Sequence, residues 1–427
     1  MTTEQVTAIN KQLLTLSDRY NAHNRRGELK QAQEVAYEVL ALVPNHKLAS
    51  IQVTMLEGRM GHNENAFKMA QDLLKTADLE KDSDDFIFQL FDTLAETCSK
   101  THRYEAARWY ASQAIHIRLK RYAKTGTPAR PITTPAFPLS ENKTENIISY
   151  SLYGDKPRYC EVAVMNATLA KNIYPEWTCR FYVDDSVPPQ IIKRLTQRGA
   201  QIINMQNSNL PGLFWRFMVA DDANVKRFIV RDADSLISYK ERAAVNEWIA
   251  SGKHFHVIRD TYVHCELILA GMWGGCGGAL GGMHAWINSF PETFTSDSRN
   301  IDQQFLRRHL WQTVAQSVFI HDFNHATPDS HPFPLNYPIS DIELIPNFHI
   351  GMIDAHRTTR ITIDDENAAR IEWFLLDQHN EIVCQYEADV AENGEIALIL
   401  PSSYTQKIAN KEWHITARTL VKKEKQQ

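Results

Sequence analysis

The chain has 427 residues, of which 43% are hydrophobic, and carries a formal net charge of -5 with a sequence pI near 6.4. This length is sufficient for two or three domains, each with its own core. Because acidic and basic residues are mixed along the chain, the composition argues against a general electrostatic grip on nucleic acid or on anionic lipid.

The sequence contains no recognisable signal for secretion or membrane insertion. The N-terminal segment MTTEQVTAINKQ lacks a basic stretch followed by an apolar one, and no later segment approaches the roughly 18 apolar residues of a membrane span. The six cysteines show no CxxC pair and no regular spacing, which favours reduced thiols. We therefore predict a cytoplasmic protein with no membrane span and no nucleic-acid partner.

Residues 1–125 have the apolar periodicity of successive amphipathic helices. The stretch GELKQA at Gly27 and the stretch GHNENA at Gly61 open similar helices 34 residues apart, and HRYEAA, ending at Ala107, opens another after the insert LEKDSDD. This period resembles that of tetratricopeptide repeats, although the full consensus of tryptophan, tyrosine and proline is missing. Such repeats either present a groove to a protein partner or acceptor, or only buttress the neighbouring domain.

A proline-rich linker is predicted for residues 126–146, with prolines at 128, 131, 135 and 138. Each proline fixes its own φ and biases the preceding residue toward extended geometry, so the linker should be semi-rigid.

Residues 147–355 alternate short apolar runs with helical stretches, which is typical of a mostly parallel sheet covered by helices on both faces. We predict strands at 147–154, 177–185, 200–206 and 225–235, with helices at 157–174, 188–199 and 212–222. Ligands of such sheets bind beyond the carboxyl ends of the strands, which here are Tyr153 and Gly154, Asp184 and Asp185, and the stretch RDADS.

Residues 356–427 alternate apolar and polar side chains in five short runs, which predicts a small C-terminal β-sandwich. The predicted fold class is therefore multidomain, α plus α/β plus β: N-terminal helical repeats, a central Rossmann-like α/β domain and a β-rich C-terminal domain.

Two aspartates end the strand FIVRDADS, and they are the main chemical signal of the sequence. Successive side chains of a strand point to opposite faces, so Asp232 and Asp234 lie on the same side. Two neighbouring carboxylates repel, and a Mg²⁺ or Mn²⁺ ion that also binds a nucleotide diphosphate would let both ionise. Because Asp82 and Asp84 form the same pattern in a polar insert with no assigned function, the motif alone is weak.

Further motifs follow in order: LFWRFMVADDANVKRFIVRDADS, then LILAGMWGG, then NIDQQFLRRH. Together they make residues 147–355 resemble nucleotide-sugar glycosyltransferases of the GT-A fold with a DxD motif, most nearly the glycogenin-like, family-eight type. The resemblance implies that Asp232 and Asp234 hold the metal and that Arg216 lies near the donor diphosphate. It also implies that the first strand's end accepts the nucleotide base. The predicted nucleotide-sugar contacts are Tyr150, Tyr153, Gly154, Asp184, Arg216, Asp232 and Gln303.

The third metal ligand is where the sequence departs from that family. The family pattern His-x-x-Gly-x-x-Lys-Pro-Trp is reduced here to NFHIGMID. We favour His321, which ends the apolar run SVFIHD, over His349, which keeps a nearby glycine.

Two acidic residues are candidates for the chemistry at the sugar. Asp302 could stabilise the positive charge that develops at the anomeric carbon, or could merely cap a helix. Glu266 could act as a general base on an acceptor hydroxyl if the enzyme inverts configuration. The glycine-rich stretch 271–282 suggests either a mobile wall between donor and acceptor or a cluster of tight turns.

We expect a metal-dependent glycosyltransferase of the hexosyltransferase type that moves a sugar from a nucleotide diphosphate donor, UDP-linked, to a glycan or other hydroxyl acceptor. The alternatives are a non-catalytic adaptor that binds partners through its repeats and, less favoured, a nucleotidyltransferase. The sequence leaves open the donor sugar, the acceptor, the stereochemistry and the oligomeric state.

Overall fold

The computed structural model describes residues 3–290, 300–354, 358–365 and 367–422. The chain divides into two compact units. The helical unit comprises Met1–Thr127, Arg259–Leu267 and Ile320–Pro332, and the α/β unit comprises Pro128–Ile258, Ile268–Phe319 and Phe333–Gln427. The predicted domain boundary at residues 355–356 lies outside the described residues.

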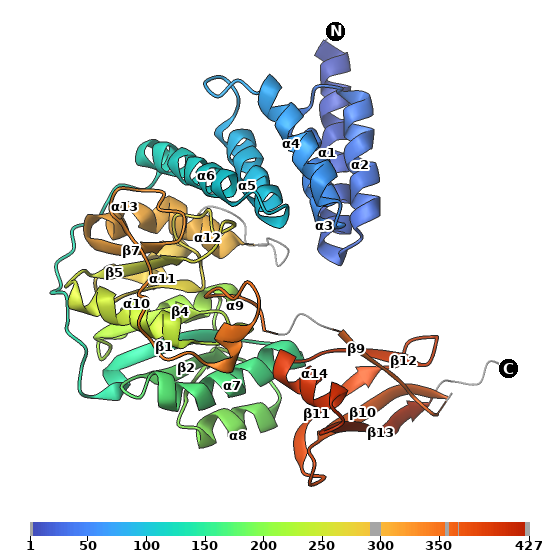
Figure 1. Ribbon diagram of the computed structural model, residues 1–427, viewed down its shortest axis with the longest axis vertical. Helices are drawn as coiled ribbons and strands as arrows, with labels where there is room; N and C mark the ends of the chain where they lie inside the picture. The colour runs from blue at the N-terminus through green and yellow to red at the C-terminus, as the bar shows by residue number, and fades with distance from the viewer. Residues whose placement is uncertain (1–2, 291–299, 355–357, 366, 423–427) are drawn as a thin grey trace. The chain divides into compact units, whose positions relative to one another are not determined.

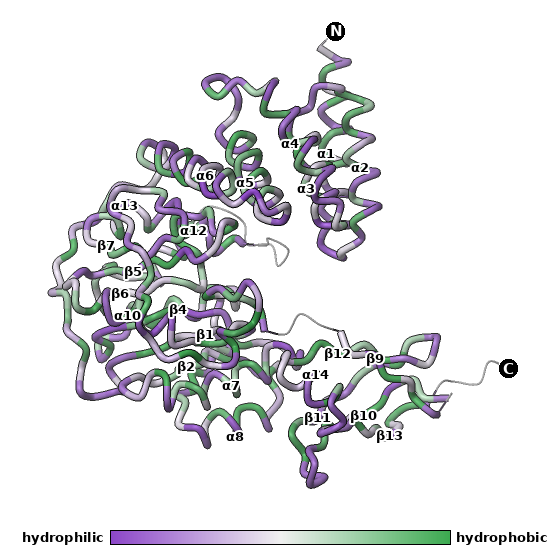
Figure 2. Tube along the Cα trace, in the orientation of Figure 1, coloured by the Kyte–Doolittle hydropathy of each residue, from purple (hydrophilic) through white to green (hydrophobic). Residues whose placement is uncertain are grey.

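Six helices form the N-terminal region, and each packs against the next along the chain, which confirms the predicted helical region (Figure 1). They are α1 (Thr3–Arg26), α2 (Leu29–Leu42), α3 (Lys47–Arg59), α4 (Asn63–Thr76), α5 (Asp84–Lys100) and α6 (Tyr104–Thr125). Hydrophobic and hydrophilic residues alternate along these helices, as amphipathic packing requires (Figure 2). Among the described helices of the chain, none is both long and apolar enough to cross a membrane.

The helical repeat is visible in the backbone as well as in the sequence. Gly27, Gly61 and His102 precede α2, α4 and α6 by the same interval, and each has a positive φ, of 74°, 91° and 61°. The distance from Gly61 to His102 is 41 residues, which is the first interval of 34 plus the 7 residues of the insert LEKDSDD. Fully buried alanines recur at the same two offsets after each turn: Ala32 and Ala36, Ala66 and Ala70, and Ala107 and Ala111.

The turn before α6 has a histidine at the positive-φ position where the turns before α2 and α4 have glycine, so we expect its backbone to be strained. We expect His102→Gly to raise the free energy of unfolding by about 1 kcal/mol, since a side chain with a Cβ is disfavoured at positive φ. His102→Ala is the matched control: it also loses the contact of the imidazole with the Tyr104 hydroxyl, at 2.8 Å, but keeps the Cβ. Chemical unfolding of the three proteins measures this, and a midpoint for His102→Gly at or below that of His102→Ala would contradict the strain.

A central sheet of eight strands has the order β3-β2-β1-β4-β6-β5-β7-β8. The strands are β1 (Asn146–Leu152), β2 (Thr178–Val183), β3 (Gln201–Asn204), β4 (Arg227–Arg231), β5 (Phe255–Arg259), β6 (Met272–Cys276), β7 (Val318–Asp322) and β8 (Ser330–His331). Strand β6 is antiparallel to β4 and β5, whereas β1 is parallel to both β2 and β4. The first four are the strands predicted from the sequence.

Helices accompany these strands as the alternating pattern predicts. They are α7 (Pro157–Ile173), α8 (Pro189–Gln197), α9 (Gly212–Trp215), the 3-10 helix η2 (Arg216–Asp221), α10 (Tyr239–Ala250), α11 (Met283–Asn288), α12 (Ile301–Phe305) and α13 (Trp311–Val314). Helices α7 and α8 each have a proline in the first turn, where the missing N–H costs nothing and the fixed φ favours the helix.

The order of the strands creates a switch point beside β1. The chain runs from β1 to β2 and β3 on one side and then continues with β4 on the other side of β1. The register aligns Tyr150 with Arg231, so that the segments after the two strands leave from the same edge of the sheet. Ligands of α/β sheets bind in the crevice outside such a reversal, which here lies between the segments starting at Tyr153 and at Asp232.

The glycine-rich stretch differs in part from its prediction. Residues Met272–Cys276 form β6, a fully buried strand between β4 and β5, whereas residues 277–282 form the cluster of turns that the sequence offered as an alternative, with positive φ at Gly278, Gly281 and Gly282. The glycines make room for neighbouring strands: a Cβ at Gly274 would lie 2.7 Å from the Phe228 carbonyl oxygen, and one at Gly275 would lie 2.8 Å from the Phe228 ring.

All five predicted C-terminal strands are present, in a three-stranded antiparallel sheet of order β11-β10-β13 and a two-stranded sheet of β12 and β9. The strands are β9 (Thr358–Thr362), β10 (Ala368–Leu376), β11 (Ile382–Asp389), β12 (Glu395–Ile399) and β13 (His414–Lys422). The helix α14 (Ser402–Ala409) was not predicted.

A buried carboxylate connects these C-terminal elements to the rest of the α/β unit. Glu161 of α7 is fully buried and accepts two hydrogen bonds from Arg194 of α8, at 2.7 and 2.8 Å. It also accepts hydroxyl hydrogen bonds from Tyr386 of β11, at 2.6 Å, and from Tyr404 of α14, at 3.1 Å. The C-terminal strands therefore share the core of the α/β unit instead of forming a separate appendage.

Candidate functional site

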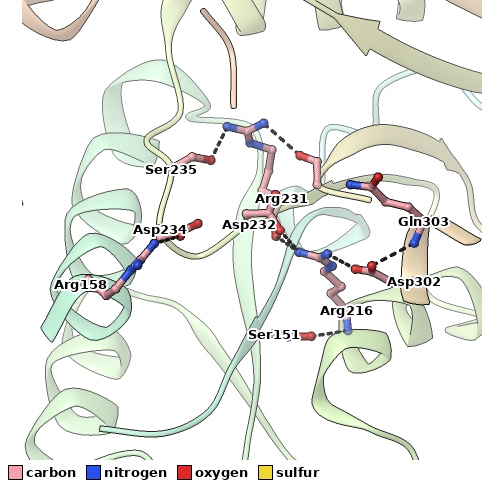
Figure 3. A network of polar contacts seen from close by, with 10 residues as sticks. Ser151, Arg158, Arg216, Arg231, Asp232, Asp234, Ser235, Asp302 and Gln303 are labelled. Carbon is pink, nitrogen blue, oxygen red and sulfur yellow. Dashed lines mark hydrogen bonds and ion pairs between the residues drawn. The ribbon is translucent and has the colours of Figure 1, made fainter. Parts of the chain in front are cut away.

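Arg216 lies between two carboxylates at the switch-point edge of the sheet (Figure 3). Its Nη1 pairs with Asp232, which follows β4, and its Nη2 donates to Asp302 Oδ2 of α12 at 2.8 Å. Arg216 and Asp302 are only 5% and 4% exposed, whereas the Asp232 side chain is 45% exposed. Asp232 is therefore the member of this trio that presents charge to solvent.

Two serines of β1 hold the backbone of Arg216. The Ser149 hydroxyl donates to the Arg216 carbonyl at 2.6 Å, and the Arg216 N–H donates to Ser151 Oγ at 3.0 Å. Both serines lie on the same face of β1, because they are two residues apart in a strand. Strand β1 thus fixes the start of η2 and, through it, the position of the guanidinium.

Asp302 is held from two sides. Besides Arg216, the backbone N–H of Gln303 donates to Asp302 Oδ1 at 2.9 Å. The N-cap residue of α12 is Asn300, so Asp302 does not have the capping role that the sequence offered as an alternative. The Asp302 carboxylate is therefore buried, with each of its two oxygens accepting one hydrogen bond.

Asp234 has a separate arginine partner. Arg158 of α7 donates from Nη2 to Asp234 Oδ2 at 2.8 Å, on the other side of the segment from Arg216 (Figure 3). The Asp234 side chain is 12% exposed, and its backbone carbonyl accepts from the Asp354 N–H at 2.9 Å. The two aspartates therefore have different surroundings, because β4 ends at Arg231 and they lie in the turn after it, where the predicted alternation of a strand no longer holds.

The pKa values of the three carboxyl groups move in different directions. Burial raises the pKa of Asp302, and the charge of Asp232 adds to this effect against that of Arg216. Burial and the neighbouring Asp232 also raise the pKa of Asp234, against Arg158. At Asp232 the effect of burial is outweighed by Arg216, so its pKa is lowered. Asp232 is thus the carboxylate most strongly held in the charged form, and a cation nearby would favour ionisation of all three.

The donor set fits a hard cation only in part. Carboxylate oxygens suit Mg²⁺ or Mn²⁺, and within the described part of the chain no other side chain donates to Asp232 or Asp234 beyond the two arginines. The same described residues contain no group of three or more His, Cys, Asp and Glu side chains arranged to hold a metal ion. Substrate phosphates and water would have to supply the remaining ligands, as magnesium sites commonly allow.

Neither predicted histidine is established as a third ligand. His321 is the buried fourth residue of β7 and belongs to the helical unit, whereas the two aspartates belong to the α/β unit. His349 belongs to the same unit as the aspartates, and its Nδ1 lies 3.0 Å from the Asn347 carbonyl oxygen. The segment after His349 runs beside the aspartates, since Ile353 forms a β-bridge with Ser235. Both assignments stay predictions, and proximity along the backbone now favours His349.

Gly271 lies against Asp232, whereas the sequence analysis treated it only as part of the glycine-rich stretch 271–282. A Cβ at this position would overlap the Asp232 carboxylate, so only glycine permits the observed side chain. The Gly271 carbonyl also accepts from Arg231 Nη1 at 3.0 Å, which fixes the backbone at the start of β6.

Three of the predicted nucleotide contacts lie just after strands: Tyr153 and Gly154 follow β1, and Asp184 follows β2. Tyr153 is 42% exposed directly after β1, and its ring packs edge-on against Trp215 at 5.8 Å. Gly154, with φ of 76°, donates its N–H to Ser186 Oγ at 2.6 Å, and the Ser186 N–H donates to Asp184 Oδ1 at 3.1 Å. Asp184 therefore braces the loop of Gly154.

Tyr150 differs from its prediction. Its side chain is fully buried and stacks on Phe181, with ring centroids 4.8 Å apart. It therefore forms part of the core under the site and has no surface for a nucleotide.

Glu266 also has a different setting from the predicted general base. It belongs to the helical unit, and its Oε1 accepts from Arg118 Nη2 of α6 at 3.3 Å. Its catalytic assignment therefore stays a prediction without geometric support. Arg158, Ser149, Ser151 and Gly271 were missed, although the position of Arg158 after a helix-starting proline that follows the first strand was a usable signal.

Comparisons with known proteins identify no family. No family model matches the chain, and no curated protein matches it. A point mutant of the O-GlcNAc transferase of Thermobaculum terrenum matches over 54% of this chain and 47% of its own, about half its length, with 14% identity and a TM-score of 0.29. A similarity this low carries no argument about fold or activity.

The Arg216 network makes a testable prediction about stability. We expect Arg216→Met to lower the free energy of unfolding by about 3–5 kcal/mol, because Asp302 is left as a buried charge without its counter-ion. Adding Asp302→Asn should recover part of the loss, since it removes that charge.

The matched control is Arg370→Met, which breaks the exposed pair of Arg370 with Glu387 at 2.8 Å and should cost less than about 1 kcal/mol. Chemical unfolding measures all four proteins. A loss for Arg216→Met no larger than that of the control would show that the buried trio does not stabilise the fold.

Proposed function

We propose that this protein is a metal-dependent glycosyltransferase that transfers a sugar from a nucleotide diphosphate donor, a UDP-sugar, to a glycan or other hydroxyl acceptor. The observation that carries the proposal is that Asp232 and Asp302 bind the same arginine, Arg216, at the switch point of a mostly parallel sheet, with Asp234 two residues after Asp232. It agrees with the GT-A resemblance of the sequence, which assigned the same aspartates to the metal and the same crevice to the donor.

The donor would lie across the ends of β1 and β4. Exposed Tyr153 offers an aromatic face for the nucleotide base, and the braced loop at Gly154 offers backbone groups beside it. The diphosphate would then lie toward Asp232 and Asp234. A bound Mn²⁺ or Mg²⁺ ion would neutralise the charge that appears on the departing diphosphate.

Asp302 is the residue we propose to act at the sugar. Arg216 and the Gln303 N–H orient its carboxylate, which could face the positive charge that develops at the anomeric carbon. In this proposal Arg216 positions Asp232 and Asp302 and does not itself bind phosphate, because both of its terminal nitrogens already contact carboxylates.

Two observations favour the alternative of a non-catalytic adaptor. Both aspartates of the motif are paired with arginines, which would neutralise them without any metal. In the helical unit, α6 also exposes two large aromatic side chains, Tyr104 and Trp109, as a partner- or acceptor-binding surface would. Calorimetry with UDP and Mn²⁺ separates the two functions, since an adaptor should bind no nucleotide in a metal-dependent way.

The proposal predicts the effect of Asp234→Asn. This change removes one charged ligand but keeps the size of the side chain, so donor turnover should fall roughly 100-fold or more while the midpoint of thermal unfolding stays close to that of the wild type. A panel of nucleotide sugars, assayed with Mn²⁺ and then with excess chelator, measures the turnover.

Asp84→Asn is the matched control, because Asp84 ends the other Asp-x-Asp sequence and is exposed in the first turn of α5. It should leave turnover unchanged. Equal turnover by wild type and Asp234→Asn would remove the assignment of Asp234 and, with it, the proposed activity.

A further inference from the structure

Among the described residues, the Arg158 side chain makes one ion pair, with Asp234, and its guanidinium carbon lies over the Tyr159 ring, 4.8 Å from the centroid. Its Nη2 donates to Asp234, while its Nε is buried and has no hydrogen-bond partner within the described part of the chain. A guanidinium has five N–H donors in a planar fork and commonly binds two acceptors at once. Arg158 thus keeps donor capacity beyond Asp234.

Arg216 provides the contrast. Its Nε is likewise buried without a hydrogen-bond partner among the described residues, but both of its terminal nitrogens contact carboxylates, and only 6% of its side chain is exposed. The side chain of Arg158 is 25% exposed and starts from the second residue of α7, directly after the loop that follows β1. Arg216 is therefore bound on two sides, whereas Arg158 is bound to one carboxylate and is the more exposed of the two.

Asp234 needs a positive partner whether or not a ligand is bound. Its side chain is 12% exposed and it follows Asp232 by two residues, so an unpaired charge there would be both desolvated and repelled. A divalent cation at Asp234 would supply the missing charge but would repel the guanidinium of Arg158. Asp234 therefore cannot keep Arg158 and a divalent cation as close partners together.

We propose that Arg158 exchanges partners: it neutralises Asp234 in the empty site and moves to the diphosphate of the donor when a divalent cation takes the Asp234 carboxylate. This inference rests on the proposed function and adds a coupling to it. The cation binds weakly alone because it must displace Arg158, and it binds tightly with the diphosphate because the displaced guanidinium then gains a phosphate partner. By linkage, the diphosphate gains the same factor from the cation.

Arg158→Gln tests the exchange, because the two halves of the proposal predict shifts of opposite sign. Without the competing guanidinium, Mn²⁺ alone should bind about tenfold more tightly. Without the phosphate contact, UDP at saturating Mn²⁺ should bind about tenfold more weakly. The coupling between the two ligands, of the 5- to 150-fold size roughly typical of linked sites, should shrink accordingly. Isothermal titration of the full chain with Mn²⁺, and with UDP in excess Mn²⁺, gives both constants.

Two further variants control the experiment. Arg158→Lys keeps the charge without the fork and should bring both constants back toward those of the wild type. Arg242→Gln removes another arginine–carboxylate pair of the α/β unit, that of Arg242 with Glu176 at 2.9 Å, and should change neither constant.

The outcomes separate the two proposals. Opposite shifts in Arg158→Gln, restored by lysine, support the exchange. If Arg158→Gln weakens both ligands or changes neither, while the wild type binds UDP only with Mn²⁺, the exchange is wrong and the proposed function survives. If the wild type shows no metal-dependent binding of UDP, the proposed function fails and the exchange fails with it.

Discussion

The candidate site depends on one arginine buried between two carboxylates. Arg216 is bound through its backbone to β1 and through its guanidinium to the segment after β4 and to α12. It therefore links three elements that are distant in the sequence. A buried ion pair contributes little net stability compared with apolar packing, but each of its members is costly to leave alone, so the three elements must come together in one arrangement.

The local structure of the central region was readable from the sequence because each element carries its own signal. The apolar run before Asp232 can only be a buried strand, and Pro157 and Pro189 mark helix starts by removing an N–H that the helix does not use. The placement of Asp232 and Asp234 just after a strand followed from the end of the apolar run, although the strand itself also contains two buried arginines, Arg227 and Arg231.

The partners of these residues could not be read in the same way. Arg158 and Asp234 are 76 positions apart, and Arg216 and Asp302 are 86 apart, so their contacts exist only in the folded chain. The prediction for Tyr150 was wrong for a different reason. Its position near the end of a strand suggested an exposed side chain, but the alternation of side chains along β1 points it into the core. Gly271 and Gly274 look alike in the sequence, yet one makes room for a carboxylate and the other for a backbone carbonyl.

The four-residue network around Glu161 has a practical consequence for anyone who wishes to express the α/β unit by itself. A fragment that ends before β9 would delete the phenol groups of Tyr386 and Tyr404, and would also uncover the apolar residues that pack under β10. In such a fragment the Glu161 carboxylate would keep only its two hydrogen bonds from Arg194. The newly exposed apolar residues would favour aggregation during purification. A fragment that contains the α/β unit should therefore retain the residues through β13.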